Sequence, residues 1–315
     1  MAEMLCEYHV PIMAKQVVDL LAPERGGVFV DGTLGGGGHS EAILERLPEG
    51  ARLYGIDRDG DAIANSTARL MRFSAAFAAV RGNFFDMKAL LSQYDIYGVD
   101  GILLDLGVSS HQLDCPERGF SYRYTAPLDM RMDKDAKLSA YDVVNRYPEA
   151  ELRRIFFEYG EERFSSRIAQ TIARRRAEKP IETTTELAQL VAGAIPAKFR
   201  NEPQHPARRC FQAIRIEVNG ELDGLKAAVN SAEELLNPAG RLVILTFHSL
   251  EDRIVKNCFK TFEQPCTCPK DLPVCVCGKK PTAKILTRHP ITADEDEQLN
   301  NPRSSPAKLR AIEKL

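Results

Sequence analysis

The chain has 315 residues, of which 44% are hydrophobic and 27% charged, and its formal net charge is −2. These values predict an ordinary water-soluble globular protein of about two domains. No apolar run approaches the roughly 18 residues of a membrane span, and the acidic start, residues 1–7, lacks the apolar core of a signal peptide. We therefore exclude membrane and secreted proteins and expect a cytoplasmic location.

The first predicted strand, residues 28–30, ends in Asp31 and leads into a loop with five glycines between positions 32 and 38. A helical pattern follows, and a second strand, residues 52–56, ends in Asp57. Glycine lets a backbone turn sharply and approach a ligand closely. An acid about twenty residues beyond such a loop holds the ribose hydroxyls in α/β nucleotide sites. This order of elements predicts a nucleotide-type cofactor pocket.

The acids at the strand ends favour one cofactor over another. Ser40 stands where a G-x-G-x-x-G pattern that begins at Gly35 would place its last glycine, which argues against a pyrophosphate site. Asp31, Asp57 and Asp105 suit the sulfonium cation, the amine and the ribose diol of S-adenosylmethionine better than they suit a diphosphate. The alternative is a merely flexible glycine loop, with Asp31 capping the end of its strand.

The other elements of the sheet alternate helical periodicity with short apolar runs, and continuous apolar runs are typical of parallel strands. We expect helices over residues 62–70 and 222–236, and strands over residues 77–80, 100–106, 241–247, 283–287 and 307–312. Residues 139–195 interrupt the sheet with helical periodicity, and the proline-rich stretch 196–206 is interpreted as a linker. We predict a discontinuous, Rossmann-like α/β domain at residues 1–114 and 207–315, with an inserted, mostly helical substrate domain at residues 115–206.

Charge is distributed unevenly along the chain. Residues 1–110 contain 9 Lys/Arg against 15 Asp/Glu, whereas residues 151–215 contain 13 Lys/Arg against 8 Asp/Glu. Clustered positive charge is typical of phosphate-backbone binding. Alone it would favour a solvated helix face with local glutamate partners, but beside a methyl-donor pocket it favours RNA. Arg174, Arg175 and Arg176 are then candidate RNA contacts.

Nine motifs occur in one order along nearly the whole chain, at residues 9–13, 31–40, 56–59, 104–110, 118–121, 128–133, 159–164, 247–253 and 301–304. In this order the chain strongly resembles the bacterial 16S ribosomal RNA cytosine-N4 methyltransferases of the MraW family. The resemblance implies a Rossmann-like S-adenosylmethionine-dependent methyltransferase fold. It also implies methyl transfer to the N4 of a cytosine in the decoding region, with 16S rRNA, within the small ribosomal subunit, as the partner. A homodimer is left open.

The resemblance also implies which residues bind S-adenosylmethionine. Gly37, Gly38 and His39 would face its methionine part, and Asp57 its ribose.

Phe84 would pack on the adenine, and Asp105 and Gln112 would line the far wall. His111 stands where many family members have proline, directly before Gln112.

Asp105 is the candidate catalytic residue. The lone pair of a cytosine N4 amine is delocalised into the ring, so a hydrogen-bond acceptor on that amine would localise it and accept developing positive charge. Asp105 follows a central strand, at the ligand-binding edge of the sheet. Residues 105–108 lack the Asp/Asn/Ser-Pro-Pro-aromatic pattern common in amino-methyltransferases that act on bases. The alternative, that Asp105 only binds the cofactor, carries equal weight.

The loop that follows Asp105 carries aromatic and basic residues. Phe120, Tyr122 and Tyr124 alternate with Arg118 and Arg123, which suits a platform for an extruded base and a clamp for its phosphates. The alternative is that these residues fill the interface between the two domains.

His248 follows the last parallel strand. One alternative is that it contacts the target base or phosphate. The other, which is commoner for a histidine at such a position, is that it is buried and hydrogen-bonded. The spacing of Ser249 and Asp252 predicts that Ser249 caps the next helix.

Four cysteines lie within twelve residues, at positions 266, 268, 275 and 277. They could hold a structural zinc ion, but the C-x-C spacing strains a chelate, and disulfides are disfavoured in a reducing cytosol. We treat them as thiols of a loop, with zinc as the alternative, and expect no catalytic metal.

Two competing functions use the same features. A nicotinamide-dependent oxidoreductase would share the glycine loop and Asp57 but would want a cleaner phosphate-binding turn. A non-catalytic RNA-binding protein would bind nucleic acid regardless of the methyl donor.

Overall fold

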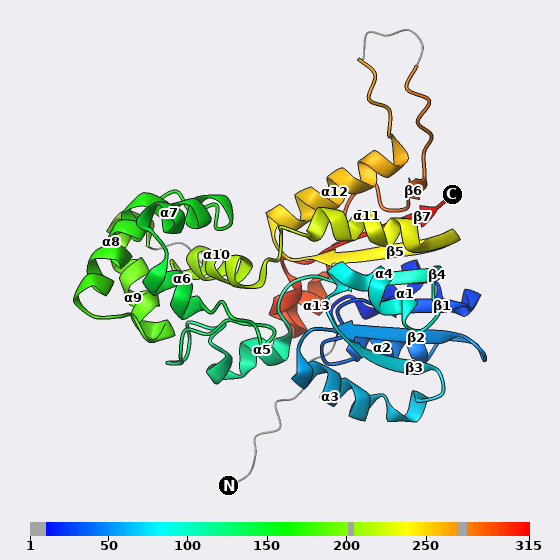
Figure 1. Ribbon diagram of the computed structural model, residues 1–315, viewed down its shortest axis with the longest axis horizontal. Helices are drawn as coiled ribbons and strands as arrows, with labels where there is room; N and C mark the ends of the chain where they lie inside the picture. Colours follow the sequence, from blue (N-terminus) through cyan, green and yellow to red (C-terminus); the bar gives the residue numbers. More distant parts are fainter. Residues whose placement is uncertain (1–10, 201–204, 270–275) are drawn as a thin grey trace. The chain divides into compact units, whose positions relative to one another are not determined.

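The computed structural model describes residues 11–200, 205–269 and 276–315 (Figure 1). Residues 1–10 of the predicted first domain, part of the predicted linker and Cys275 lie outside the described residues. The chain forms two compact units, which we call the sheet unit (residues 11–107 with 222–315) and the helical unit (residues 108–221). No described helix is long and apolar enough to span a lipid bilayer.

The sheet unit contains, in its described part, a seven-stranded sheet in the order β3-β2-β1-β4-β5-β7-β6. The strands are β1 Val28–Asp31, β2 Arg52–Asp57, β3 Phe77–Arg81, β4 Val99–Asp105, β5 Leu236–Thr246, β6 Ala283–Ile285 and β7 Lys308–Lys314. β1 to β5 pair in parallel, and β7 runs antiparallel to β5 and β6. The predicted α/β class is confirmed, and all strands form where the apolar runs predicted them.

Helices cover both faces of this sheet because successive strand residues point to opposite sides. Ile102 and Leu104 of β4 belong to one apolar cluster and Leu103 to the other, and all three are fully buried. One face packs on α1, α2 and α3, and the other on α4, α11 and α12. The helices are α1 Ala14–Leu21, α2 Gly38–Leu44, α3 Gly60–Arg69, α4 Met87–Ser92, α11 Leu225–Leu235, α12 Ser249–Glu263 and α13 Glu295–Asn300, with short 3₁₀ turns at Pro23–Arg25, Met71–Phe73, Phe84–Asp86 and Pro302–Ser304.

The strand order places a topological switch point between β1 and β4. From β1 the chain adds β2 and then β3 on one side, and it returns to add β4 on the other side. In open α/β sheets, ligands bind outside the carboxyl ends of the strands at such a point. The fold therefore directs attention to the ends of β1, β2 and β4.

The helical unit is built around one apolar core, which includes Phe156, Ile168 and Ile214. Its helices are α5 Ser110–Asp114, α6 Ala140–Arg146, α7 Glu149–Glu158, α8 Ser165–Glu178, α9 Thr184–Ala194 and α10 Arg208–Asn219, with 3₁₀ turns at Pro116–Arg118 and Ala197–Phe199.

The unit extends beyond the predicted inserted domain, residues 115–206, at both ends. The main difference is α10, which the prediction gave to the sheet domain. Its apolar face, including Phe211 and Ile214, is buried in the same core as the face of α7. An amphipathic pattern predicts that a helix has a buried face but not which core receives it.

Candidate active site of the sheet unit

Three carboxylates lie at the carboxyl ends of neighbouring strands in the sheet unit. Asp31 ends β1, Asp57 ends β2 and Asp105 ends β4, and β1 lies between the other two strands. Parallel pairing brings these ends to one edge of the sheet. The edge predicted from the sequence is therefore assembled as expected.

Asp31 braces the glycine loop. Its carboxylate accepts hydrogen bonds from the Ser40 hydroxyl at 2.7 Å and from the Thr33 backbone N–H at 3.1 Å, and the side chain is buried. Burial raises the pKa of Asp31, while its bond to Ser40 opposes that change. The alternative of a capped strand end thus describes Asp31 correctly.

Glycine is required at two positions of this loop. A Cβ on Gly32 would lie 2.5 Å from Leu104 Cδ2, so a side chain there would collide with the end of β4. Gly37 has φ +76°, the left-handed region that glycine adopts without strain, and its carbonyl accepts the N–H of Glu41 to begin α2. The loop follows a fixed path, which argues against a merely flexible segment.

Asp57 is tied to the same loop. One carboxylate oxygen accepts the N–H of Gly35 at 2.8 Å, and the other accepts the N–H of Asp59 at 2.9 Å. Burial raises the pKa of Asp57 to about 6, and the two backbone donors oppose the change. Each oxygen keeps a further lone pair for a ligand hydroxyl.

Phe84 lies next to the end of β2. The N–H of Gly82 donates to the Asp57 carbonyl at 2.9 Å, and Asn83 accepts the N–H of Phe85 to begin the short turn that carries Phe84. The Phe84 ring packs edge-on against that of Phe85, with ring centroids 4.7 Å apart, and remains half-buried. The structure therefore keeps an aromatic surface beside the acid that was predicted to hold ribose.

Of the three acids, Asp105 has the most unusual environment. Its backbone N–H donates to Thr33 Oγ1 at 2.6 Å, which joins the end of β4 to the glycine loop. Its Oδ2 lies 3.4 Å from His39 Nδ1, while its Oδ1 is buried with no hydrogen-bond partner among the described residues. Burial raises the pKa of Asp105 to about 6, and His39 opposes the change. An unsatisfied buried acceptor of this kind calls for a donor from a ligand.

These groups fit S-adenosylmethionine. Carboxylates at a switch point attract a sulfonium centre and an ammonium group and accept hydrogen bonds from ribose hydroxyls, whereas they repel a diphosphate. Asp57 offers acceptor lone pairs and Asp105 offers an unsatisfied oxygen. The sequence analysis missed Thr33 and Ser40, since no spacing rule marks hydroxyls that brace a loop.

Gln112 belongs to the helical unit. It is buried in α5, where its side-chain oxygen accepts the N–H of Ser109 at 3.2 Å and its own N–H donates to the Ser109 hydroxyl. This reciprocal pair is a capping box. Its predicted role on the far wall of the cofactor site stays a prediction.

The predicted cap of the helix after β5 is wrong by one residue. His248, and not Ser249, is the N-cap of α12, and its partner is Glu251 in place of Asp252. The Glu251 carboxylate accepts the backbone N–H of Phe247 at 2.9 Å and lies 3.0 Å from His248 Nε2. An imidazole nitrogen serves here as the acceptor that a hydroxyl usually supplies. The His248 side chain is only 7% exposed, which agrees with the expectation of a buried histidine.

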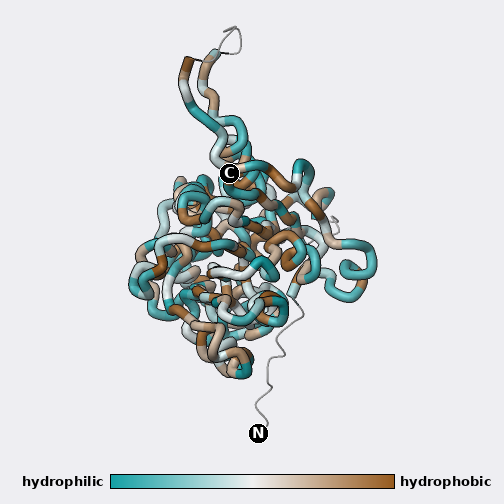
Figure 2. Tube along the Cα trace, turned by 90° about the vertical axis from the view of Figure 1, so that its right-hand side faces the viewer, coloured by the Kyte–Doolittle hydropathy of each residue, from teal (hydrophilic) through white to brown (hydrophobic). Residues whose placement is uncertain are grey.

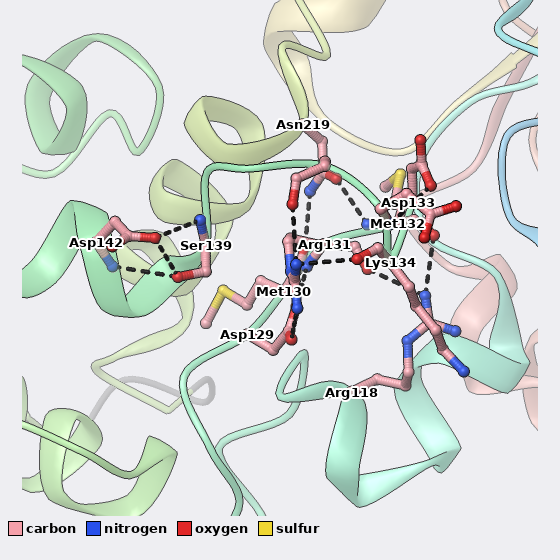
Figure 3. Close-up of polar contacts among 12 residues, drawn as sticks. Arg118, Asp129, Met130, Arg131, Met132, Asp133, Lys134, Ser139, Asp142 and Asn219 are labelled. Carbon is pink, nitrogen blue, oxygen red and sulfur yellow. Dashed lines mark hydrogen bonds and ion pairs between the residues drawn. The ribbon is translucent and has the colours of Figure 1, made fainter.

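The predicted phosphate clamp at Arg118 is contradicted in the helical unit (Figure 3). Arg118 is only 4% exposed, and its guanidinium donates to the backbone carbonyls of Arg131 and Met132, both at 3.0 Å. Phe120 is also buried in the core of this unit. Both residues support the 128–133 loop, Arg118 through these hydrogen bonds and Phe120 through apolar packing in the same cluster.

The other members of the predicted aromatic platform are divided. Tyr122 stacks on His205, with ring centroids 4.6 Å apart and an interplanar angle of 20°, so one ring face is covered. Tyr124 is 51% exposed and Arg123 is exposed as well. Only these two keep the accessibility that contact with RNA needs.

The arginines of α8 also divide. Arg175 pairs with Glu186 at 2.7 Å, and Arg176 donates to the carbonyls of Val144 and Tyr147. Arg174 and Arg167 are exposed, are seven positions apart, and form no ion pair with any residue in the described ranges. Seven residues make nearly two full turns, so these two arginines share one face of the helix.

A surface pocket lies within the helical unit, lined in part by Phe164 and Phe199. The guanidinium of Arg163 lies over the ring of Phe199 there, with Cζ 3.9 Å from the ring centroid, and it also lies over the ring of Phe164. Arg208 and Arg209 line the same pocket. Guanidinium and aromatic groups together provide stacking surfaces and phosphate donors.

The switch-point site and the mixed sheet, parallel from β1 to β5, define an S-adenosylmethionine-dependent methyltransferase, as the sequence predicted. The MraW methylase family model matches residues 7–315, and the chain belongs to this family. Membership of a methylase family decides against the nicotinamide oxidoreductase.

Curated relatives match over almost their whole length. The chain is 52% identical over 307 residues to ribosomal RNA small subunit methyltransferase H of Carboxydothermus hydrogenoformans, with 98% of both chains covered. It is 51% identical over 309 residues to the protein of that name from Heliobacterium mobile, with 98% of this chain and 99% of the relative covered. Among solved structures, an rRNA methylase from Streptococcus thermophilus is similar at 10% identity with a TM-score of 0.39, covering 96% of this chain and 93% of that one.

Proposed function

We propose that this protein transfers a methyl group from S-adenosylmethionine to the N4 of a cytosine in the decoding region of 16S rRNA, in the cytoplasm. Relatives at about half identity carry the name ribosomal RNA small subunit methyltransferase H, which supports rRNA of the small subunit as the substrate. The observation that carries the reaction is the buried Oδ1 of Asp105 at the sheet edge, which has no hydrogen-bond partner in the described part of the chain.

Asp105 would act on the exocyclic amine. When bound, S-adenosylmethionine supplies the methyl carbon, and its carbon–sulfur bond breaks as the carbon–nitrogen bond forms. The Asp105 carboxylate accepts a hydrogen bond from the amine, which localises the nitrogen lone pair and stabilises the positive charge that develops there. A pKa of about 6 lets the same group take the proton that the methylated nitrogen releases. His39, whose Nδ1 lies 3.4 Å from Asp105 Oδ2, would share that proton with Asp105.

The remaining site residues would bind the donor. Gly37, Gly38 and His39 would face its methionine part, since they follow the glycine loop where it meets α2. Asp57 would accept from the ribose hydroxyls, and the half-buried Phe84 ring would pack on adenine. Holding carbon, nitrogen and sulfur in line is the main contribution that such contacts make to methyl transfer.

The helical unit would bind RNA. Arg167 and Arg174 present positive charge on one exposed face of α8, and the pocket at Arg163 offers stacking surfaces. Because N4 of a paired cytosine lies inside a duplex, the target base must be unpaired or extruded before it reaches Asp105.

The test uses small ribosomal subunits from cells that lack this gene, together with their naked 16S rRNA. We expect the purified protein to transfer labelled methyl from S-adenosylmethionine to one of these substrates. Nuclease digestion and mass spectrometry should then find N4-methylcytidine in the decoding region. Methylation of another atom, of another region or of neither substrate contradicts the proposal.

A further inference from the structure

Three cysteines outside the methyltransferase site converge in the segment between α12 and β6. The Sγ atoms of Cys266, Cys268 and Cys277 all lie within 4.8 Å of one another. The Cys266 and Cys277 sulfurs are 3.9 Å apart. Sulfur ligands about 2.3 Å from a tetrahedral zinc ion are separated by about 3.8 Å, so this spacing matches an edge of a zinc tetrahedron. It is nearly twice the length of a disulfide bond.

We propose that Cys266, Cys268 and Cys277 bind a structural zinc ion that holds this segment in shape. Thiolates are soft ligands, which favour zinc over magnesium or calcium. The C-x-C spacing does not prevent convergence, because alternate residues of an extended backbone point to the same side. Neither Cys266 nor Cys268 lies in a helix or strand.

The base of the segment is anchored to the sheet unit. The N–H of Thr282 donates to the Phe262 carbonyl at 2.9 Å, and the N–H of Ile285 donates to Glu263 Oε1 at 3.1 Å. Phe262 and Ala283 are buried on either side of these bonds. The two arms that leave this base run alongside each other and away from the sheet in both views (Figures 1 and 2).

Beyond the base, the described residues of the two arms form no apolar core of their own. Among residues 264–269 and 276–282, none is buried and none belongs to a helix or strand. Chain segments too small to bury a core usually depend on a metal ion or a disulfide for a defined structure. The cysteine cluster is the feature of these arms that could supply such a constraint.

The backbone next to the cluster suits a metal ligand. Gly278 follows Cys277 directly and has φ +64°, a left-handed conformation that turns the chain without strain. Lys279 and Lys280 come next in the sequence and are exposed. Their charge partly offsets that of several thiolates around one divalent ion.

Metal content of the purified full-length protein tests the proposal. Prepared without chelators, the protein should contain about one zinc ion per chain by elemental mass spectrometry. The triple variant Cys266→Ser, Cys268→Ser, Cys277→Ser should lose it, and Cys115→Ser, which changes a half-buried cysteine of the helical unit, should keep it. Cys275 stays unchanged in every variant.

Two further measurements separate a built site from loose binding. Cobalt substitution should give thiolate-to-metal charge-transfer absorption in the parent and not in the triple variant. Removing zinc should expose residues 264–282 to protease without changing cleavage elsewhere. Zinc that is absent from the parent, or that persists in the triple variant, overturns the proposal. So does iron in place of zinc, or a disulfide among these cysteines found by intact mass. None of these readouts depends on methyl transfer.

Discussion

His39 Nδ1 lies 3.4 Å from Asp105 Oδ2, while Nε2 of the same ring lies 2.8 Å from the carbonyl oxygen of Ile12. A carbonyl only accepts, so Nε2 must carry a proton and donate it. Any second proton of the pair then lies between Nδ1 and the Asp105 carboxyl group. His39 and Asp105 therefore form one proton-holding unit beside the unsatisfied Oδ1.

Asp105→Asn should lower the rate of methyl transfer by about 10²- to 10³-fold. The amide keeps the size of the carboxyl group but loses its charge and its ability to take a proton. Donor and RNA affinity should change much less. Single-turnover rates with saturating substrates provide the measurement, and Asp95→Asn, at an exposed acid, is the control. Equal rates for the two variants would contradict a catalytic role.

The rate of methyl transfer should rise with pH through about 6. Burial raises the pKa of Asp105 to about 6, and the ionised form is the one that accepts a hydrogen bond from the amine. A pH–rate profile of single-turnover methylation should show this limb in the parent. The residual rate of Asp105→Asn should lack it, and a limb that persists in the variant would assign the titration to another group.

The same pKa predicts how stability depends on pH. The folded chain binds the Asp105 proton more tightly than the unfolded chain, whose carboxyl pKa is near 3.8. The stability that this group contributes is complete below about pH 4 and is lost as pH rises through about 6. Asp105→Asn should therefore be more stable than the parent at pH 7.5, by up to about 3 kcal/mol. Urea unfolding at pH 4 and 7.5 checks this, and an advantage of equal size at both values contradicts it.

Asp57→Ala should weaken binding of S-adenosylmethionine by about 10- to 100-fold, since the ribose hydroxyls lose a charged acceptor. The affinity of Asp57→Asn for S-adenosylmethionine should lie between those of Asp57→Ala and the parent, because the amide retains one acceptor for the Gly35 N–H. Isothermal titration calorimetry measures both, with Asp86→Ala as a control at an exposed acid. Unchanged affinity in Asp57→Ala would remove this residue from the site.

Arg118→Met should destabilise the protein by about 2–4 kcal/mol, because two buried carbonyls lose their charged donor. Arg123→Met, at an exposed arginine of the same loop region, should change stability by less than about 0.5 kcal/mol. Urea unfolding followed by circular dichroism compares them. Lower RNA affinity for Arg118→Met with stability unchanged would restore the phosphate clamp.

The paired variant Arg167→Ala, Arg174→Ala should bind RNA more weakly. The slope of log affinity against log salt should become shallower by about 2, roughly one for each lost phosphate contact. Arg175→Ala with Arg176→Ala should instead reduce stability, because these side chains hold Glu186 and two carbonyls. Filter-binding titrations over a range of salt concentrations measure the slopes, and equal slopes for both pairs would refute this division.

Much of the site could be predicted because it depends on local order in the chain. Apolar strands that end in Asp31, Asp57 and Asp105 had to meet at one sheet edge once the strands paired in parallel. The roles of surface-like residues could not be predicted in this way. Arg118 looked like an exposed clamp, yet it is buried, because the carbonyls that it satisfies lie in a loop thirteen residues away.

The sequence by itself determined the class of the sheet, the glycine loop and the family, since these follow from periodicity, spacing and the order of motifs. Only the tertiary structure decided that Asp31 braces the loop while Asp105 keeps an unsatisfied oxygen. It also decided that α10 packs in the helical unit and that three cysteine sulfurs converge. The reason is physical: periodicity records which face of an element is apolar, whereas pairing, burial and pKa depend on which distant side chains the fold brings within a few ångströms.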